Sequence, residues 1–301
     1  MLAIVIPYYK LTYFEKTLQS LANQTDKRFK VYIGDDASTE SPIDLLEKYK
    51  GQFDFVYHLF ESNLGGISLT KQWDRCIALS GDEEWLMILG DDDYLETNVI
   101  ASWYKYYGEF YRKSNVIRFA SKSVNMKLNG IISNSFTHPV LEKATDSYYR
   151  RFKGLTRSTL SEYVFSKASF LKYGFHDFPL AWHSDDAAWL DFSNNKPIYT
   201  INESNVFVRF SDSSISGNYA NHNLKYMASE QYFKYVTFHK LRFFKKKNRL
   251  ELLMAYEVRI KNNRKLDLKD WFSLMNLYLM NFKFVPFVKY TRRFLISLIY
   301  Q

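Results

Sequence analysis

Short apolar runs alternate with amphipathic segments along the first ninety residues of the chain. The runs end at or near proline, glycine or acidic residues, and this pattern predicts strands that are buried on both faces of a sheet. The predicted strands cover residues 2–7, 29–33, 53–59 and 85–89. Apolar residues at helical spacing fill the intervening segments, over about 12–22, from Ser41-Pro42 onward and over 67–79.

This order of strands and helices favours a parallel, doubly wound sheet with helices on both faces. A predicted helix over 97–113 and a strand over 115–120 continue the pattern, and 121–139 is expected to be an irregular connection with hairpin potential. In the first helix, Thr12 and Glu15 predict a capping box. Ligands of such sheets bind beyond the carboxyl ends of the strands, so the chemistry is expected in the residues that follow them.

Three consecutive carboxylates, Asp91, Asp92 and Asp93, follow the fourth predicted strand. Adjacent Asp side chains repel one another and cannot all be buried without a positive partner. A hard cation such as Mg²⁺ or Mn²⁺ commonly lies between protein carboxylates and the phosphates of a substrate, whereas a solvated acidic turn is the alternative. A second acidic pair, Asp35 and Asp36, follows the second strand at the same predicted edge and favours the cation site.

The sequence offers no glycine-rich loop for phosphates. After the first strand it is Pro7-Tyr8-Tyr9-Lys10, and no Walker motif occurs. Bound phosphates would therefore depend on a metal ion and on scattered basic groups. Lys71, Arg75 and Arg118 are the candidates.

A third acidic pair, Asp185 and Asp186, lies between two tryptophans, Trp182 and Trp189. In one interpretation Ser184 caps a helix whose first turn carries two carboxylates favoured by the helix dipole. In the other, one carboxylate projects into a cleft as a general base. The tryptophans belong to the core, or one of them stacks on a sugar.

Positive charge is concentrated in the tail of the 301-residue chain. The net charge is +9, but residues 240–301 alone carry +11. In the last predicted helix, Phe287, Tyr290, Phe294, Leu295 and Leu298 share one face and Lys289, Arg292 and Arg293 share the other. Such a helix either covers the rest of the protein or lies in an anionic membrane interface. Nucleic acid is not an expected partner, because no recognition motif accompanies the charge.

The single cysteine, Cys76, excludes a disulfide framework and a cysteine-based zinc site, and it is expected in the core. Met1 leads directly into a predicted strand, without the pattern of a signal peptide. No apolar run reaches the roughly 18 residues that a membrane span requires. We therefore expect a cytoplasmic protein, soluble or peripheral on the inner face of the plasma membrane.

Five motifs, in this order, resemble those of the family 2 glycosyltransferases of bacterial polysaccharide synthesis. They are Ile4-Val5-Ile6-Pro7-Tyr8-Tyr9, Gly34-Asp35-Asp36-Ala37-Ser38-Thr39, Asn63-Leu64-Gly65-Gly66, Gly90-Asp91-Asp92-Asp93 and Ser184-Asp185-Asp186. The resemblance implies a GT-A fold in residues 1–220, which is Rossmann-like with a mostly parallel central sheet, followed by a helical, basic extension over 221–301. It also implies a nucleotide-diphosphate sugar donor, usually a uridine nucleotide, and inversion at the anomeric carbon.

The same resemblance implies roles in binding the nucleotide. By position, Pro7 and Tyr8 would contact the nucleotide, and Asp36, with Asp35 near it, would recognise the base. Lys71 lies where the family often has a basic residue close to the nucleotide.

For the metal and the base, the resemblance implies that Asp91 and Asp92 approach the ribose and the metal and that Asp93 holds Mn²⁺ or Mg²⁺ on the diphosphate. Asp186 matches the second residue of the family's Glu-Asp pair, which is the catalytic base. Because the first residue is Asp185 here instead of Glu, the choice between the two stays open.

The resulting hypothesis is a metal-dependent, inverting glycosyltransferase that moves a sugar from a UDP-sugar to a hydroxyl of a glycan or lipid-linked acceptor. The stretch Arg209-Phe210-Ser211-Asp212-Ser213-Ser214 suits a mobile loop that closes over the donor phosphates. A sugar-phosphate nucleotidyltransferase is one alternative, although such enzymes generally need a glycine-rich basic loop. A non-catalytic, membrane-surface glycan-binding protein is another, and intact Asp36, Asp93 and Asp186 argue against it.

Overall fold

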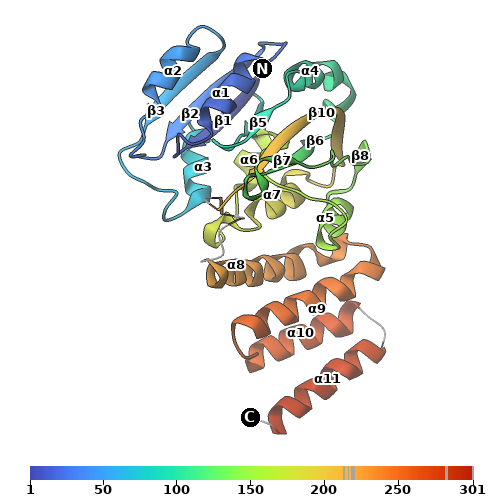
Figure 1. The fold of residues 1–301 in the computed structure, drawn as a ribbon. Coiled ribbons are helices and arrows are strands. Elements are labelled where there is room, and N and C mark those ends of the chain that lie inside the picture. Colours follow the sequence, from blue (N-terminus) through green and yellow to red (C-terminus); the bar gives the residue numbers. More distant parts are fainter. Residues whose placement is uncertain (213, 216, 218–220, 282–283, 300–301) are drawn as a thin grey trace. The chain divides into compact units, whose positions relative to one another are not determined.

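The computed structural model describes residues 1–212, 214–215, 217, 221–281 and 284–299 (Figure 1). The chain forms two compact units, Met1–Ala220 and Asn221–Gln301. The first unit contains all of the strands assigned in the described residues, and the second is helical.

The strands are β1 (Leu2–Tyr8), β2 (Phe29–Asp35), β3 (Asp54–Leu59), β4 (Trp85–Ile88), β5 (Tyr94–Leu95), β6 (Val116–Asn125), β7 (Ile131–Ile132), β8 (Leu141–Glu142), β9 (Tyr163–Ser166) and β10 (Ile198–Phe210). The helices of the first unit are α1 (Phe14–Ala22), α2 (Ile43–Tyr49), α3 (Leu69–Ile77), α4 (Val99–Phe110), α5 (Ala144–Phe152), α6 (Lys167–Tyr173) and α7 (Ser184–Phe192). Those of the second unit are α8 (His222–Tyr235), α9 (Lys246–Asn263), α10 (Leu268–Asn281) and α11 (Phe284–Ile299).

One sheet organises the first unit, with the strand order β3-β2-β1-β4-β9-β6-β10-β5. The pairs among β3, β2, β1 and β4 are parallel, as the alternation of strands and helices predicted. β9 lies antiparallel between β4 and β6, and this insertion was not predicted. β7 pairs with β6 in the segment where the sequence had hairpin potential.

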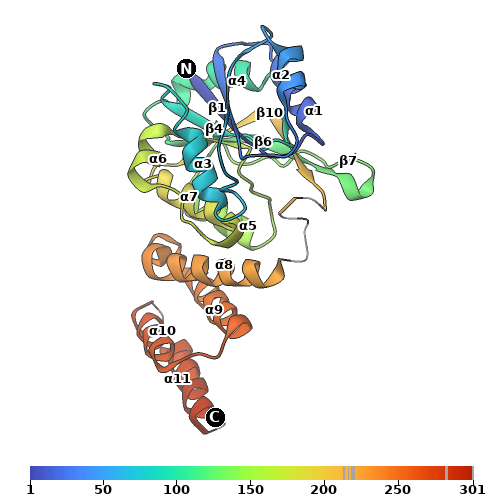
Figure 2. The same cartoon turned by 90° about the vertical axis from the view of Figure 1, so that its left-hand side faces the viewer.

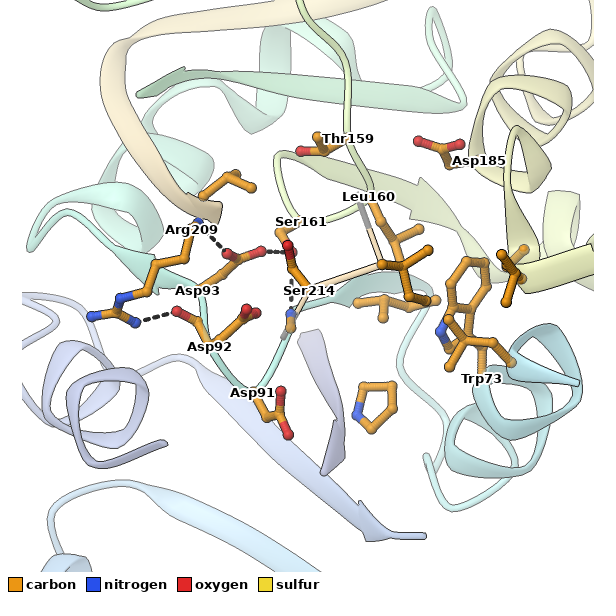
Figure 3. A pocket seen from close by; sticks show the side chains of 18 of the residues that line it. Trp73, Asp91, Asp92, Asp93, Thr159, Leu160, Ser161, Asp185, Arg209 and Ser214 are labelled. Carbon is orange, nitrogen blue, oxygen red and sulfur yellow. Dashed lines mark hydrogen bonds between the residues drawn. The ribbon is translucent and has the colours of Figure 1, made fainter. Parts of the chain in front are cut away.

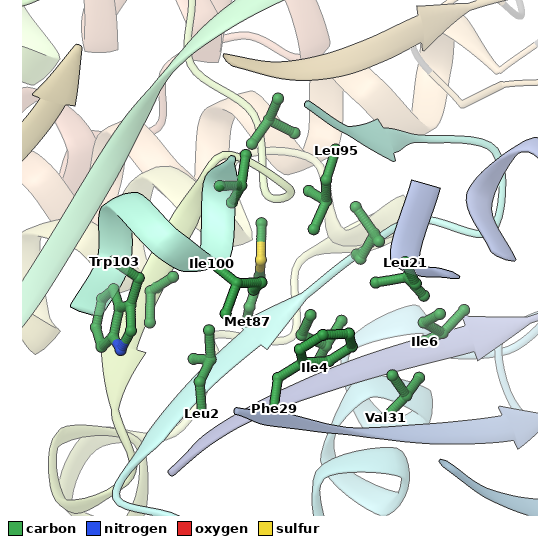
Figure 4. Close-up of a cluster of buried hydrophobic side chains, with 14 of the residues drawn as sticks. Leu2, Ile4, Ile6, Leu21, Phe29, Val31, Met87, Leu95, Ile100 and Trp103 are labelled. Carbon is green, nitrogen blue, oxygen red and sulfur yellow. The ribbon is translucent and has the colours of Figure 1, made fainter. Parts of the chain in front are cut away.

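Helices cover both faces of the central strands (Figures 1 and 2). The side chains of these strands alternate between two apolar layers, so both faces are buried. Leu2, Ile4 and Ile6 of β1 pack in a cluster that includes residues of α1, α2 and α4 (Figure 4). Ala3 and Val5 face the other way, into a cluster with residues of α3 and α7. This arrangement explains the unbroken apolar runs of the sequence. Cys76 is buried in the second cluster, as predicted.

The predicted capping box of the first helix is wrong. α1 begins at Phe14, and its N-cap residue, Tyr13, makes no side-chain capping hydrogen bond. Thr12 therefore lies outside the capping position. Glu15 instead forms an exposed ion pair with Lys48.

Arg118 is not available to phosphates, contrary to the expectation from the sequence. Its side chain is fully buried and forms an ion pair of 3.0 Å with Glu142. It also donates hydrogen bonds to Ser147 Oγ and Thr200 Oγ1, at 2.6 and 3.1 Å. Glu142 in turn accepts hydrogen bonds from Arg150. Arg118 is therefore part of a buried polar network that joins β6, β8, β10 and α5.

The second unit shows which face of the last helix is buried. Tyr290 and Phe294 pack on Trp271 of α10, with ring centroids 5.1 and 5.4 Å apart. Leu295 and Leu298, predicted on that same face, are exposed. Among the described residues, no helix has both the length and the apolar character needed to cross a membrane.

Arg118→Met tests the buried network, because it nearly keeps the side-chain volume and removes the cation. We expect the free energy of unfolding to fall by about 3 kcal/mol, since removal of one partner leaves buried polar groups without their charge partner. Chemical denaturation measures the change. As a control, Lys50→Ala removes an exposed ion pair with Glu47 and should change stability very little. Equal losses in the two variants would contradict the role of the network.

Candidate functional site

A pocket of about 530 Å³ opens at the carboxyl ends of β1 and β4 (Figure 3). Asp91, Asp92 and Asp93 form one side of it, and Asp185 lies across the pocket from them. Much of the remaining wall is apolar and includes Leu69, Trp73, Ile88, Leu160, Leu180 and Val208. The pocket thus brings together acidic residues that are far apart in the sequence.

Asp91 ties the acidic turn to the end of β1. Its Oδ2 atom accepts hydrogen bonds from the backbone N–H groups of Tyr9 and Lys10, at 2.8 and 2.9 Å. From α1, Thr17 Oγ1 donates to the carbonyl oxygens of Asp91 and Asp93, at 3.0 and 2.7 Å. The turn is therefore fixed by β1 and α1 as well as by β4.

Asp93 is buried and accepts two hydrogen bonds from distant segments. Ser161 Oγ donates to its Oδ2 atom at 2.5 Å, and the backbone N–H of Arg209 donates to its Oδ1 atom at 2.8 Å. Burial and the neighbouring Asp92 raise the pKa of Asp93 to about 8, and the same two causes raise the pKa of Asp91 to about 7. Burial and mutual repulsion therefore disfavour full ionisation of the turn, and a cation would favour it.

The donor set fits a metal that is held jointly by protein and substrate. In the part of the chain that the structure describes, no three His, Cys, Asp or Glu side chains are arranged to hold a metal ion. Carboxylate oxygens at a pocket wall suit Mg²⁺ or Mn²⁺, which usually take one or two carboxylates and complete their shell with water and substrate phosphates. Oδ2 of Asp91 accepts two N–H groups and each carboxylate oxygen of Asp93 accepts one hydrogen bond, so the remaining lone pairs of these two residues and the Asp92 carboxylate are the candidate ligands.

Arg209 supplies a cation next to the acidic turn. Its guanidinium donates to the carbonyl oxygen of Asp92 and lies over the rings of Tyr13 and Tyr94, 4.6 and 4.9 Å from their centroids. Arg209 belongs to β10, at the start of the stretch that the sequence predicted as a loop. Ser214, from the same stretch, lines the pocket, whereas Ser213 lies outside the described residues.

Asp35 and Asp36 are buried and are not among the residues that line the pocket. Asp35 accepts hydrogen bonds from Ser38 N and Tyr57 Oη, at 2.8 and 2.7 Å. Asp36 accepts from Leu64 N and Gly65 N, at 2.7 and 2.9 Å, and pairs with Arg75.

The motif Asn63-Leu64-Gly65-Gly66 holds the Asp36 carboxylate in place. A Cβ atom at Gly65 would lie 2.5 Å from Asp36 Oδ2, so only glycine allows this approach. Both carboxylate oxygens of Asp36 are thus engaged by protein partners.

Of the other residues predicted to bind the nucleotide, only some line the pocket. Pro7 lines the pocket, together with Tyr9 and Lys10. Tyr8 is buried, and its hydroxyl donates to the carbonyl oxygen of Glu40. Lys71 is exposed on α3 and is not a lining residue.

Asp185 and Asp186 have different surroundings although they are adjacent. Asp185 lines the pocket, and burial followed by the charge of Asp186 raises its pKa to about 7. Asp186 is buried, and its Oδ2 atom forms an ion pair with Arg151 Nη1 at 2.6 Å and a hydrogen bond with His183 Nδ1 at 2.8 Å. Ser184 is the first residue of α7 and donates to His176 O, so the interpretation in which it caps the helix is wrong.

The loop that precedes α7 lines the pocket and has a strained backbone. Leu180, Ala181 and His183 have φ values of 59°, 51° and 70°, in the left-handed region that non-glycine residues rarely adopt. All three, and Trp182 between them, line the pocket. Trp189, in contrast, belongs to the core and stacks on Tyr163 at 4.2 Å.

Three residues of the site were missed in the sequence. Ser161 and Arg151 hold Asp93 and Asp186, and Tyr13 packs under the Arg209 guanidinium. None belongs to a local motif, and each acts on a residue more than thirty positions away. Only the folded chain reveals their partners.

The sequence of this chain matches a known protein family. A family model described as "Glycosyl transferase family 2" matches residues 3–168, more than half of the chain. A poly(ribitol-phosphate) beta-glucosyltransferase of Bacillus spizizenii is 28% identical over 128 residues, which cover 41% of this chain and 19% of that protein. The poly(ribitol-phosphate) beta-N-acetylglucosaminyltransferase TarS of Staphylococcus aureus is 27% identical over 127 residues, covering 41% and 21%. The matched segments thus span about a fifth of the length of these curated relatives.

Among solved structures, S. aureus TarS 1–349 in complex with UDP-GlcNAc resembles this chain with a TM-score of 0.65. The match covers 92% of this chain and 79% of that one at 17% sequence identity. A likeness at this identity establishes the fold, and the GT-A fold that the sequence motifs implied is confirmed.

Ala181→Gly tests the strain in the loop. Glycine adopts positive φ without a Cβ clash, so we expect the free energy of unfolding to stay unchanged or to rise by up to about 1 kcal/mol. The matched control is Ala101→Gly within α4, where glycine should lower it by about 1 kcal/mol. Thermal denaturation of both variants measures the difference, and an equal loss would mean that the loop at Ala181 is unstrained.

Proposed function

Since the family model spans more than half of its length, the chain belongs to glycosyl transferase family 2, and we propose that it transfers a sugar from a UDP-sugar to a hydroxyl of a glycan or lipid-linked acceptor, with inversion. The observation that carries the proposal is the pocket itself. It has a buried acidic turn on one side and a single carboxylate, Asp185, on the other. Inverting transfer needs these two groups on opposite sides of the donor sugar, one for the leaving diphosphate and one for the acceptor hydroxyl.

The acidic turn is proposed as the site of the donor diphosphate. A divalent ion bound at Asp93, with Asp92 or Asp91 beside it, would supply a Lewis acid that neutralises the charge of the leaving group. Pro7, Tyr9 and Lys10 line the same part of the pocket and support nucleotide binding there. The UDP-GlcNAc complex of TarS, which shares the fold, supports a uridine nucleotide as the donor carrier.

We assign proton transfer to Asp185. As the acceptor oxygen attacks the anomeric carbon, the Asp185 carboxylate takes the hydroxyl proton and the bond between that carbon and the diphosphate oxygen breaks. This single displacement inverts the configuration and requires no covalent enzyme intermediate. Asp186, bound by Arg151 and His183, is better suited to holding the start of α7 than to contacting substrate.

The acceptor is proposed to reach Asp185 along the wall formed by Leu180 to His183. Trp182 on this wall offers a flat apolar face of the kind on which sugar rings stack. The names of the two curated relatives contain poly(ribitol-phosphate), which supports a cell-surface polymer as the acceptor class. Sugar transfer onto such a polymer would take place where nucleotide-sugars are available. We therefore propose that the protein acts in the cytoplasm, at the inner face of the plasma membrane.

Calorimetric titration with UDP tests the donor site. We expect Mn²⁺-dependent binding by the native protein and a loss of at least about tenfold in affinity in Asp93→Ala, because the ion would lose its buried carboxylate. The control is Asp44→Ala, which removes an exposed carboxylate of α2. UDP binding that is equally tight without metal, or unchanged in Asp93→Ala, would contradict metal-dependent donor binding.

Rate measurements on two neighbouring variants test the base. Asp185→Asn should lower the rate of transfer by about 10² to 10⁴ and leave UDP binding intact, whereas Asp186→Asn should cost about tenfold or less. Because the raised pKa of Asp185 lies at about 7, the native rate should rise with pH below 7, where the base is protonated, and level off above it. The opposite ranking of the two variants would identify Asp186 as the base.

A further inference from the structure

We propose that one face of α11 is a docking surface for anionic lipid membranes. This surface, the α11 face, consists of Val285, Val288, Lys289, Arg292, Leu295 and Ile299. Their spacing of three or four residues, with Lys289 beside Val288, puts all six within about 120° of the helix circumference. The inference goes beyond the transfer reaction, because it concerns where the protein binds and not what its pocket does.

The α11 face is exposed although it is mostly apolar. Val285, Leu295 and Ile299 are 59%, 55% and 76% exposed, whereas Tyr290 and Phe294 on the opposite side of α11 are buried. A helix that packs only one side normally places polar residues on the other. Four exposed aliphatic residues aligned on the solvent side of one helix therefore indicate a binding partner.

The surface belongs to a folded hairpin of helices. Tyr290 stacks on Tyr278 with ring centroids 4.6 Å apart, and its hydroxyl donates to the carbonyl oxygen of Trp271 at 3.3 Å. Arg293 pairs with Glu257 of α9 at 2.8 Å. These contacts use the inner side of α11, so docking on the α11 face would not compete with them.

α10 adds exposed apolar residues to the same hairpin. Leu268, Phe272 and Leu279 are each more than half exposed and recur at helical spacing. Phe272 contacts Phe294 of α11, with ring centroids 5.7 Å apart. The apolar surface of the hairpin is thus larger than a single helix stripe.

Charge identifies the lipid as anionic. Residues 221–301 carry seventeen Lys and Arg against five Asp and Glu, a net charge of +12. Lys289 and Arg292 lie among the aliphatic residues, and within the described residues neither has an acidic partner. Two copies docked through this surface would bring these cations together, which disfavours self-association.

Lipid headgroups match both properties of the α11 face. The aliphatic side chains can enter the boundary between headgroups and acyl chains, while the long stems of Lys289 and Arg292 let their charges reach phosphate. Docking of this kind needs no spanning segment, in agreement with the described helices.

Vesicle co-sedimentation of the full chain tests the proposal. Vesicles of phosphatidylcholine with phosphatidylglycerol should bind the protein, more weakly as salt is raised, and vesicles of phosphatidylcholine alone should bind far less. Lys289→Ala and Arg292→Ala should each weaken binding about fivefold. The double variant Val288→Glu with Leu295→Glu should reduce it to background.

The matched control is the double variant Leu155→Glu with Leu171→Glu, which adds the same two charges at leucines of the first unit that are each 72% exposed. It should sediment with vesicles as the native protein does. UDP titration of every variant shows that the first unit is intact, so failure of docking is distinguishable from failure of the donor site.

Two results would overturn the proposal. One is that anionic vesicles fail to bind the native protein, or bind the double variant equally well. The other is a native dimer in light scattering that Val288→Glu with Leu295→Glu dissociates, because the α11 face would then cover a second copy. The first result would exclude lipid as the partner even if an acidic protein bound the chain.

Discussion

The buried carboxylates that follow β4 are the constraint on which the rest of the first unit depends. Adjacent ionised groups in a low-dielectric site repel strongly unless donors or cations surround them. Asp91 receives two backbone N–H groups from the end of β1, and Asp93 receives Ser161 and the backbone of β10. The acidic turn therefore joins segments from across the sheet, and their relative positions define the pocket. Burial and the neighbouring Asp92 nevertheless keep the pKa values of Asp91 and Asp93 above their usual range, although these hydrogen bonds lower them, and this supports the proposed cation.

The central fold was predictable because local pattern and tertiary environment agree. Continuous apolar runs such as that of β1 form strands whose two sides face separate apolar layers, so neither side requires polar residues. β9 was not predictable, since a four-residue strand inserted antiparallel between β4 and β6 carries too little pattern. Arg118 shows a second limit. In the sequence, a single arginine is equally compatible with binding phosphate and with forming a buried ion pair. Only the structure shows that Glu142 lies beside Arg118.

The site was predictable in part, for a related reason. Asp91, Asp92 and Asp93 are consecutive and follow an apolar strand, so their common position could be read directly. The groups that hold them could not, because Ser161 is 68 residues from Asp93 in the chain. Asp36 is a second example. Its place at the sheet edge was expected, but its engagement by Leu64, Gly65 and Arg75 depends on a loop that approaches closely only because Gly65 lacks a Cβ.

Asp185 and Asp186 show how one short motif can serve two purposes. Neighbouring residues on a helix point about 100° apart, so when α7 begins beside the pocket only one of the two carboxylates can face it. The strained backbone of Leu180 to His183 sets the direction in which α7 starts. Asp186 then binds His183 and Arg151, and this anchoring holds the strained turn while Asp185 faces the pocket. The second carboxylate thus stabilises the geometry on which the proposed role of the first one depends. The sequence motif matched Asp186 to the family's base, and because both residues are Asp it could not show which of them faces the pocket.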